Sequence, residues 1–153
     1  MKYIFFTALI LAYKVFSSDK EDMKRIQNDL PLVEKWEQVG LIAPRVVFCQ
    51  TYLETGCLSS KIYKQNHNRF GMKWNKRGHA LGVRNGHAYY ASEVESMMDY
   101  MDWQKQMLGN RVIHNDEEYL NFLDHLPGNR RYAEDPNYTN KLRFLIKKIW
   151  KRS

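Results

Sequence analysis

The sequence predicts an α+β domain that is mostly helical and carries one small β-hairpin. Capping residues, prolines and glycines delimit several segments that are long enough for helices. Asn85-Gly86, between two short apolar segments, is the strongest hairpin signal in the chain. The chain has 153 residues, of which 44% are hydrophobic and 27% charged. This composition fits one globular domain and argues against a largely disordered chain.

The N-terminus is typical of an export signal. Lys2 precedes an apolar run from Tyr3 to Tyr13, about 11 residues long, whereas a membrane-spanning helix needs about 20. Val15 and Ser17 suit the positions before a cleavage point. We therefore expect residues 1–17 to be a signal peptide, and we expect membrane contact only through this leader. A retained membrane anchor or a buried first helix are the alternatives.

Residues 18–153 should then form the mature domain, with the hairpin near its middle. Helices are predicted over Asp19–Leu30, Pro31–Gly40, Ala43–Gly56, Ser92–Gly109, Asn115–Leu126 and Pro136–Trp150. Ser92 with Glu95, and Asn115 with Glu118, have the spacing of a capping box. In a capping box the first side chain accepts a hydrogen bond from the backbone of the first helical turn.

The middle of the chain is strongly basic. Asn68–Trp74 is expected to be extended, and Ala80–Arg84 should pair with His87–Tyr90. Between Thr55 and Ser92 there are seven Lys and Arg residues and no Asp or Glu. The whole chain has a net charge of +7, or +5 without the two lysines of the leader. This excess suits an anionic partner or a cell-surface setting, although a solvated basic surface is the simpler interpretation.

The cysteines and histidines do not indicate a metal site. If Cys49 and Cys57 lie on one helix, their Cα atoms are about 12 Å apart, too far for a disulfide. The fold must then rely on packing. His67, His79 and His87 lack the spacing of metal ligands on a helix, and we expect no cofactor.

Glu54 is the carboxylate that stands out. It falls in the last turn of the predicted helix Ala43–Gly56, where the negative end of the helix dipole disfavours a carboxylate. The spacing of Val47, Gln50 and Glu54 places the three residues on the same side of the helix. Glu54 therefore borders the apolar face of this helix. Burial there raises the pKa of a carboxyl group, as a general acid requires near neutral pH. A surface glutamate paired with a lysine is the alternative.

Four sequence blocks occur in order along the chain. They are Arg45–Gly56, which contains Leu-Glu-Thr-Gly, then Asn66–Lys73, Tyr89–Tyr100 and Tyr132–Tyr138. Together they resemble the motifs of the bacterial glucosaminidase family, the autolysin and flagellar-type peptidoglycan hydrolases. The resemblance implies a lysozyme-like fold with a helical lobe, a small β lobe and a groove between them. It also implies endo-β-N-acetylglucosaminidase activity, which cleaves the β-1,4 bond after N-acetylglucosamine in peptidoglycan.

The resemblance further implies roles for individual residues. Glu54 would protonate the leaving oxygen, and Tyr132 would lie close to the reacting sugar. Asn68 and Phe70 match the block that shapes the floor of the groove, with turn geometry and core packing as the alternative.

Aromatic residues beside the basic segment offer further candidates for substrate binding. The rings of Trp74 and Tyr90 suit stacking against sugar rings. The alternative for such residues is that they pack the hairpin onto the helices.

The chain departs from the family pattern at two places. Cys57 stands where an aromatic residue commonly follows Glu-Thr-Gly, and no Asp or Glu lies between Glu54 and Glu93, where longer members carry a second carboxylate. Most glycosidases use two carboxylates. Glu93 and Glu95 are the next candidates, although capping explains Glu95. Three possibilities remain: the substrate's own acetamido group is the nucleophile, a later carboxylate takes part, or activity is lost.

The sequence therefore leaves four functions to consider. The first is an exported glucosaminidase, acting on peptidoglycan strands in the periplasm or outside the cell. The second is a muramidase that uses the same groove. The third is an inactive glycan-binding domain, and the fourth is a nucleic-acid-binding protein with a basic, aromatic hairpin. The export signal and the ordered blocks argue against nucleic acid as a partner.

Overall fold

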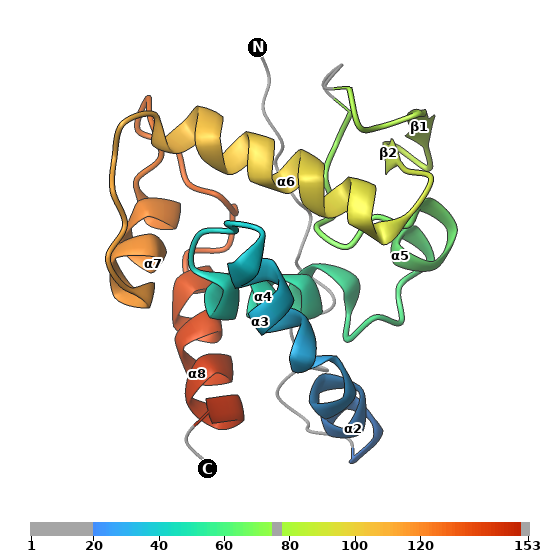
Figure 1. Cartoon of the computed structure of the whole chain (residues 1–153), viewed down its shortest axis with the longest axis horizontal. Coiled ribbons are helices and arrows are strands. Elements are labelled where there is room, and N and C mark those ends of the chain that lie inside the picture. The colour runs from blue at the N-terminus through green and yellow to red at the C-terminus, as the bar shows by residue number, and fades with distance from the viewer. Residues whose placement is uncertain (1–19, 75–77, 151–153) are drawn as a thin grey trace.

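A computed structural model describes residues 20–74 and 78–150 (Figure 1), so the predicted leader lies outside the described residues. Its helices are α2 (Lys20–Asp29), α3 (Pro31–Gln38), α4 (Pro44–Thr55), α5 (Lys61–Asn66), α6 (Glu93–Leu108), α7 (Asp116–Asp124) and α8 (Tyr138–Trp150). The strands are β1 (Gly82–Arg84) and β2 (His87–Tyr89). Within these residues, no helix has the length and apolar character needed to cross a membrane.

Helix α4 is the central element of the helical lobe. It packs against α3, α7 and α8, and nine of its 12 residues are buried. A helix that is enclosed on nearly every side has little amphipathic character, which explains why the buried residues of α4 are consecutive and not confined to one face. The longest helix, α6, runs across the bundle from the hairpin to the region of α7 (Figure 1).

The small lobe consists of α5 and the antiparallel pair β1–β2. Val83 lies opposite Ala88 in the register, as the Asn85-Gly86 turn predicts. The side-chain amide of Asn66 donates to the carbonyl oxygens of Arg84 (2.7 Å) and Ala88 (3.2 Å). The hairpin is therefore fixed to the end of α5 by side-chain hydrogen bonds.

Two local features differ from the sequence-based expectation. Helix α5 was not predicted, and it begins after Ser60, whose hydroxyl accepts a hydrogen bond from the backbone of Tyr63. The segment Asn68–Trp74 begins with a turn and is not extended throughout. The cause is the Asn68 side chain, which accepts from the backbone N–H of Met72 at 2.8 Å and so bends the chain.

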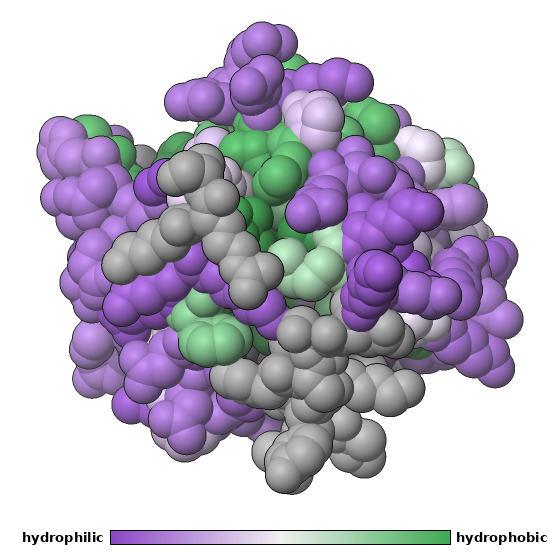
Figure 2. All heavy atoms as spheres, turned by 90° about the horizontal axis from the view of Figure 1, so that it is seen from below, coloured by the Kyte–Doolittle hydropathy of each residue, from purple (hydrophilic) through white to green (hydrophobic). Residues whose placement is uncertain are grey.

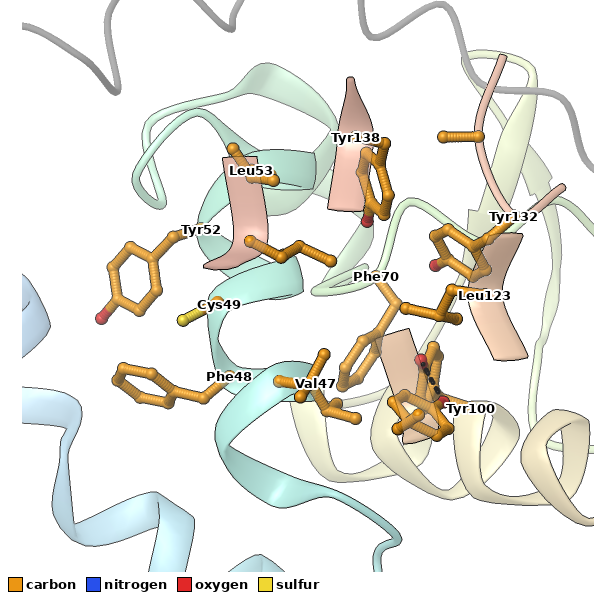
Figure 3. Close-up of a cluster of buried hydrophobic side chains, with 14 of the residues drawn as sticks. Val47, Phe48, Cys49, Tyr52, Leu53, Phe70, Tyr100, Leu123, Tyr132 and Tyr138 are labelled. Atoms are coloured by element: carbon orange, nitrogen blue, oxygen red, sulfur yellow. Dashed lines mark hydrogen bonds between the residues drawn. The ribbon is translucent and has the colours of Figure 1, made fainter. Parts of the chain in front are cut away.

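The core between the helices is rich in aromatic rings (Figure 3). Phe70 stacks on Tyr100 with ring centroids 4.4 Å apart, and Phe48 packs against Tyr52. Both cysteines are free and buried, so the domain is held by packing, as expected. Seen from below, the surface is largely hydrophilic around one gathering of apolar side chains (Figure 2).

Candidate active site

Glu54 lies in the last turn of α4, as the sequence predicts. The helix ends at Gly56, which adopts the left-handed conformation (φ 56°) that favours glycine. The Glu54 side chain is half-buried, and its Oε1 accepts a hydrogen bond of 2.8 Å from the Tyr138 hydroxyl. Burial raises the pKa of Glu54 to about 7, although the Tyr138 hydrogen bond favours the charged form.

Two tyrosines from the C-terminal block accompany this carboxyl group. Tyr132 stacks on Tyr138, with ring centroids 5.5 Å apart, and both hydroxyl groups point toward the same interior region (Figure 3). Burial, and then the nearby charge of Glu54, raise the pKa of both phenols well above 10. Both tyrosines are therefore neutral hydrogen-bonding groups at neutral pH.

The hydroxyl of Tyr132 is buried and has no hydrogen-bond partner among the described residues. Its ring is held by Tyr138 on one side and by an edge contact with Trp103, at 5.2 Å between centroids. Buried hydroxyl groups are nearly always paired, so an unpaired one beside a carboxyl group of raised pKa marks a candidate site.

Gln50 and Tyr138 contact this site, but the sequence did not assign them a role. Gln50 is fully buried one helical turn before Glu54, and its amide nitrogen donates to the Tyr138 hydroxyl at 3.3 Å. The available signals were the helical spacing of Gln50 from Glu54 and the presence of Tyr138 in the last sequence block.

Asn68 and Phe70 have structural contacts in the small lobe and core. The amide of Asn68 donates to the carbonyl oxygens of Met72 (2.8 Å) and Ala88 (2.9 Å). Phe70 is fully buried against Tyr100. These contacts favour the alternative of turn geometry and core packing over direct contact with a sugar.

The two remaining aromatic candidates differ in exposure. Trp74 is 44% exposed, so its ring is available to a ligand. Tyr90 is only 2% exposed, and its hydroxyl donates to Asp99 at 2.6 Å. Tyr90 thus supports the junction between β2 and α6, and Trp74 is the better placed of the two for sugar stacking.

Glu93, a candidate for the second carboxylate, belongs to an ion-pair network. It accepts hydrogen bonds from the Tyr63 hydroxyl (2.6 Å) and Arg69 Nε (2.7 Å), while Arg69 Nη2 contacts Asp29 at 3.2 Å. Burial opposes ionisation of Glu93, but Tyr63 and Arg69 outweigh it and lower the pKa of Glu93. Glu93 also lines a cavity of about 310 Å³ between α3 and α6, and Glu54 is not among the residues lining it.

Glu95, the other candidate, faces His79. Its carboxylate lies 3.3 Å from His79 Nδ1, and its backbone N–H donates to the capping hydroxyl of Ser92. Within residues 20–74 and 78–150, no carboxylate contributes to the raised pKa of Glu54. The described structure therefore does not bring Glu93 or Glu95 into electrostatic contact with Glu54.

Comparisons with known proteins show the family of this chain. The glucosaminidase family, described as mannosyl-glycoprotein endo-β-N-acetylglucosaminidase, matches residues 31–151. An N-acetylmuramoyl-L-alanine amidase domain-containing protein of Staphylococcus aureus is 32% identical over 123 residues, which is 67% of this chain and 20% of that protein. The chain thus spans about a fifth of the length of this relative.

A structural comparison supports the fold. The catalytic domain of the autolysin Auto from Listeria monocytogenes superposes with a TM-score of 0.61 at 19% identity. The match covers 86% of both chains. This likeness confirms the expected α+β, lysozyme-like fold.

Proposed function

Because the chain belongs to the glucosaminidase family, we propose that it is a peptidoglycan hydrolase that cleaves the β-1,4 bond after N-acetylglucosamine. Glu54 is the general acid of this proposal. The observation that supports it most is the half-buried carboxyl group whose pKa is raised to about 7. Such a group keeps a proton near neutral pH and donates it to the leaving oxygen.

The names of the relatives support peptidoglycan as the substrate and the cell wall as the place of action. One is an autolysin, and the other is named for an amidase that acts on N-acetylmuramoyl-L-alanine. That linkage occurs in peptidoglycan. In this proposal the chain is exported, and residues 1–17 are its signal peptide.

A mechanism assisted by the substrate fits the single carboxyl group. The acetamido oxygen of the N-acetylglucosamine attacks C1 while Glu54 gives its proton to the leaving oxygen. Glu54 then takes a proton from water, whose oxygen attacks C1, opens the oxazolinium ring and restores the acetamido group. This route needs no second carboxylate, which is a recognised exception among glycosidases. It is consistent with the other contacts of Glu93 and Glu95.

Tyr132 has a positioning role for the substrate in this mechanism. Its unpaired hydroxyl would donate a hydrogen bond to the acetamido group and hold it below C1. The free protein would then leave this hydroxyl unsatisfied, and the substrate would supply its partner.

Two alternatives use the same site. Cleavage of the muramyl bond would use Glu54 in the same way. An inactive glycan-binding domain is favoured by the absence of a carboxylate coupled to Glu54 in the described residues, but it gives the half-buried carboxyl group of Glu54 no role.

The test is the release of reducing ends from purified peptidoglycan by the chain from Ser18 onward. Its Glu54→Gln variant should be inactive, whereas Glu37→Gln, at an exposed position on α3, should retain activity. Mass spectrometry of the products assigns the bond that is cut. Products ending in N-acetylglucosamine support the glucosaminidase, and products ending in N-acetylmuramic acid support the muramidase. Equal activity of wild type and Glu54→Gln would remove Glu54 from its role.

A further inference from the structure

A chain of hydrogen bonds crosses the core and ends at Glu54. Its first member is Gln104 on α6, whose amide is fixed by the backbone of Ile42. Gln104 Nε2 donates to the Ile42 carbonyl oxygen (2.9 Å), and its Oε1 accepts from the Ile42 N–H (3.2 Å). The second proton of this Nε2 is donated to the Tyr119 hydroxyl at 2.7 Å. The orientation of this first amide is therefore set by backbone groups.

The next two members are tyrosines with one proton each. The Tyr100 hydroxyl donates to Gln50 Oε1 at 2.6 Å and lies 2.9 Å from the Tyr119 hydroxyl. Because Tyr100 has used its only proton, Tyr119 has to be the donor in the contact between the two hydroxyl groups. The direction of hydrogen-bond donation that is set at Gln104 therefore continues through both tyrosines to Gln50.

The last members connect Gln50 to the acid. Gln50 Nε2 donates to the Tyr138 hydroxyl, which donates to Glu54 Oε1. If the Gln50 amide were reversed, its oxygen would face Tyr138 and compete with Glu54 for the single proton of that tyrosine. Tyr100 prevents this reversal, because its donated proton requires the amide oxygen on its own side.

We propose that this chain of five residues is a positioning device that holds Glu54 Oε1 as an acceptor and directs the acid proton to Oε2. We call it the hydroxyl relay, and its members are Gln104, Tyr119, Tyr100, Gln50 and Tyr138. The proposal rests on the proposed role of Glu54 as the general acid. It explains why polar side chains occupy the centre of an otherwise aromatic core, where Gln50, Tyr100 and Tyr119 are almost completely buried.

The surroundings of Glu54 allow the relay to act on its protonation. Tyr138 on α8 donates to Glu54, Tyr132 in the loop before α8 interacts with it electrostatically, and Gln50 on α4 contacts it through Tyr138. All three are neutral at neutral pH, and in the described residues no charged group contributes to the Glu54 pKa. The hydrogen bond from Tyr138 lowers this pKa, so any loss of the relay should raise it.

The main test is Tyr100→Phe, which removes one hydroxyl whose hydrogen bonds go to Gln50 and Tyr119 and not to Glu54. We expect the alkaline limb of the kcat/KM profile to move upward by about half a pH unit, because the Tyr138 hydrogen bond is weakened. We expect kcat to fall about tenfold and KM to change less than about twofold, because the acid proton is less confined to Oε2. Tyr119→Phe, one step farther along the relay, should move the alkaline limb in the same direction by a smaller amount. It is the substitute variant if Tyr100→Phe does not fold.

The matched control is Tyr52→Phe. This variant also removes a phenol hydroxyl from α4, but the Tyr52 hydroxyl donates to Asp29 Oδ2 at 3.1 Å and lies 3.3 Å from the Arg25 carbonyl oxygen, both outside the relay. It should change stability without moving the pH profile. In a Tyr138→Phe background, Tyr100→Phe should have no further effect, because the last link is already missing.

NMR titration of protein with 13C-labelled glutamate measures the pKa of Glu54 directly. It therefore tests the effect of the relay on Glu54 without depending on catalytic activity. The relay is supported if the Glu54 pKa rises in Tyr100→Phe and Tyr138→Phe but not in Tyr52→Phe. It is overturned if Tyr100→Phe titrates like Tyr52→Phe, or if its shift persists undiminished in the Tyr138→Phe background. Activity that survives Glu54→Gln would instead refute the proposed function, since the NMR titration does not depend on activity.

Discussion

The unpaired hydroxyl of Tyr132 distinguishes this residue from the other tyrosines near Glu54. Tyr138 has both a donor and an acceptor as neighbours, whereas Tyr132 has neither among the described residues. An unsatisfied buried hydroxyl costs about 1–3 kcal/mol of folding free energy. A phenylalanine would fill the same space without this cost, so a partner that arrives with the substrate explains the hydroxyl.

Tyr132→Phe should therefore stabilise the free protein and impair the enzyme. We expect the free energy of unfolding to rise by about 1 kcal/mol, because an unsatisfied polar group is removed. The kcat should fall by at least about tenfold, because the acetamido group loses a hydrogen bond. Tyr90→Phe is the control, since its hydroxyl has Asp99 as a partner and its loss should destabilise the protein. Urea unfolding and the reducing-end assay measure the two effects, and a destabilised Tyr132→Phe would contradict the interpretation.

The raised pKa of Glu54 also predicts how stability depends on pH. The folded state holds the Glu54 proton up to about pH 7, whereas the pKa of this glutamate in the unfolded chain is 4.5. Stability from this group is fully present below about pH 4.5 and is lost as pH rises to about 7, by about 3 kcal/mol in all. The Glu54→Gln variant has no carboxyl group to ionise at this position, so its stability does not fall in this way.

The stability difference between Glu54→Gln and wild type should accordingly grow in favour of the variant from pH 4 to pH 8. Urea unfolding at a series of pH values measures it, and Glu37→Gln controls for the general effect of removing one exposed carboxylate. A difference that is constant with pH would show that Glu54 titrates normally.

At the scale of elements, the termini of the helices are the part of the fold that the sequence predicts well. Ser92 and Asn115 accept the expected hydrogen bonds from the backbone of Glu95 and Glu118, because capping depends on neighbours three residues away. The site was predicted less completely. Glu54 is visible from its place in α4, but Tyr138 is 84 residues away in the sequence, so their hydrogen bond follows only from the packing of α8 on α4.

The elements of the small lobe are joined to α6 by a contact that depends on pH. His79, before β1, lies 3.3 Å from Glu95 and 2.8 Å from Asp102, both on α6. Burial lowers the pKa of this histidine, but Asp102 and Glu95 outweigh burial and raise it above 6.5. The protonated histidine thus bridges two carboxylates in the folded protein.

His79→Gln should destabilise the protein more at pH 6 than at pH 9. A histidine with a raised pKa contributes stability that is fully present below its unfolded pKa of 6.5 and is lost as pH rises through the folded value. Urea unfolding at both pH values measures the difference, and hydrogen exchange of the β1–β2 amides shows whether the small lobe loosens. His125→Gln, at an exposed position at the end of α7, is the control. Equal destabilisation at both pH values would mean that the contact does not involve a charged histidine.

At the scale of the whole molecule, the sequence segment that supplies the small lobe is basic, while the proposed acid Glu54 lies on α4 in the helical lobe. The segment from Thr55 to Ser92 contains seven basic residues and no acidic ones, and it contributes α5 and the hairpin. In the proposed function, the reaction at Glu54 acts on a neutral glycosidic bond. Attraction to an anionic wall and cleavage of that bond should therefore respond differently to salt.

Charge reversal on α5 tests this separation. The double variant Lys61→Glu and Lys64→Glu, at exposed positions, should bind cell walls that carry anionic polymers about tenfold more weakly at low salt, because long-range attraction is lost. Its cleavage of a soluble, neutral N-acetylglucosamine oligomer should change less than about twofold, because the groups around Glu54 remain intact. Co-sedimentation with walls at low and high salt, together with the oligomer assay, measures the two effects.

The matched control for charge reversal is Lys20→Glu with Lys24→Glu, which makes the same change in net charge at exposed positions of α2, a helix separate from α5 (Figure 1). If wall binding depends on the basic small lobe, this control retains most of it, and high salt removes the difference between the two double variants. Equal losses would mean that net charge alone governs attraction to the wall. A salt-independent loss confined to the α5 variant would instead place Lys61 and Lys64 in short-range contact with the glycan, because such contacts are screened far less than attraction across solvent.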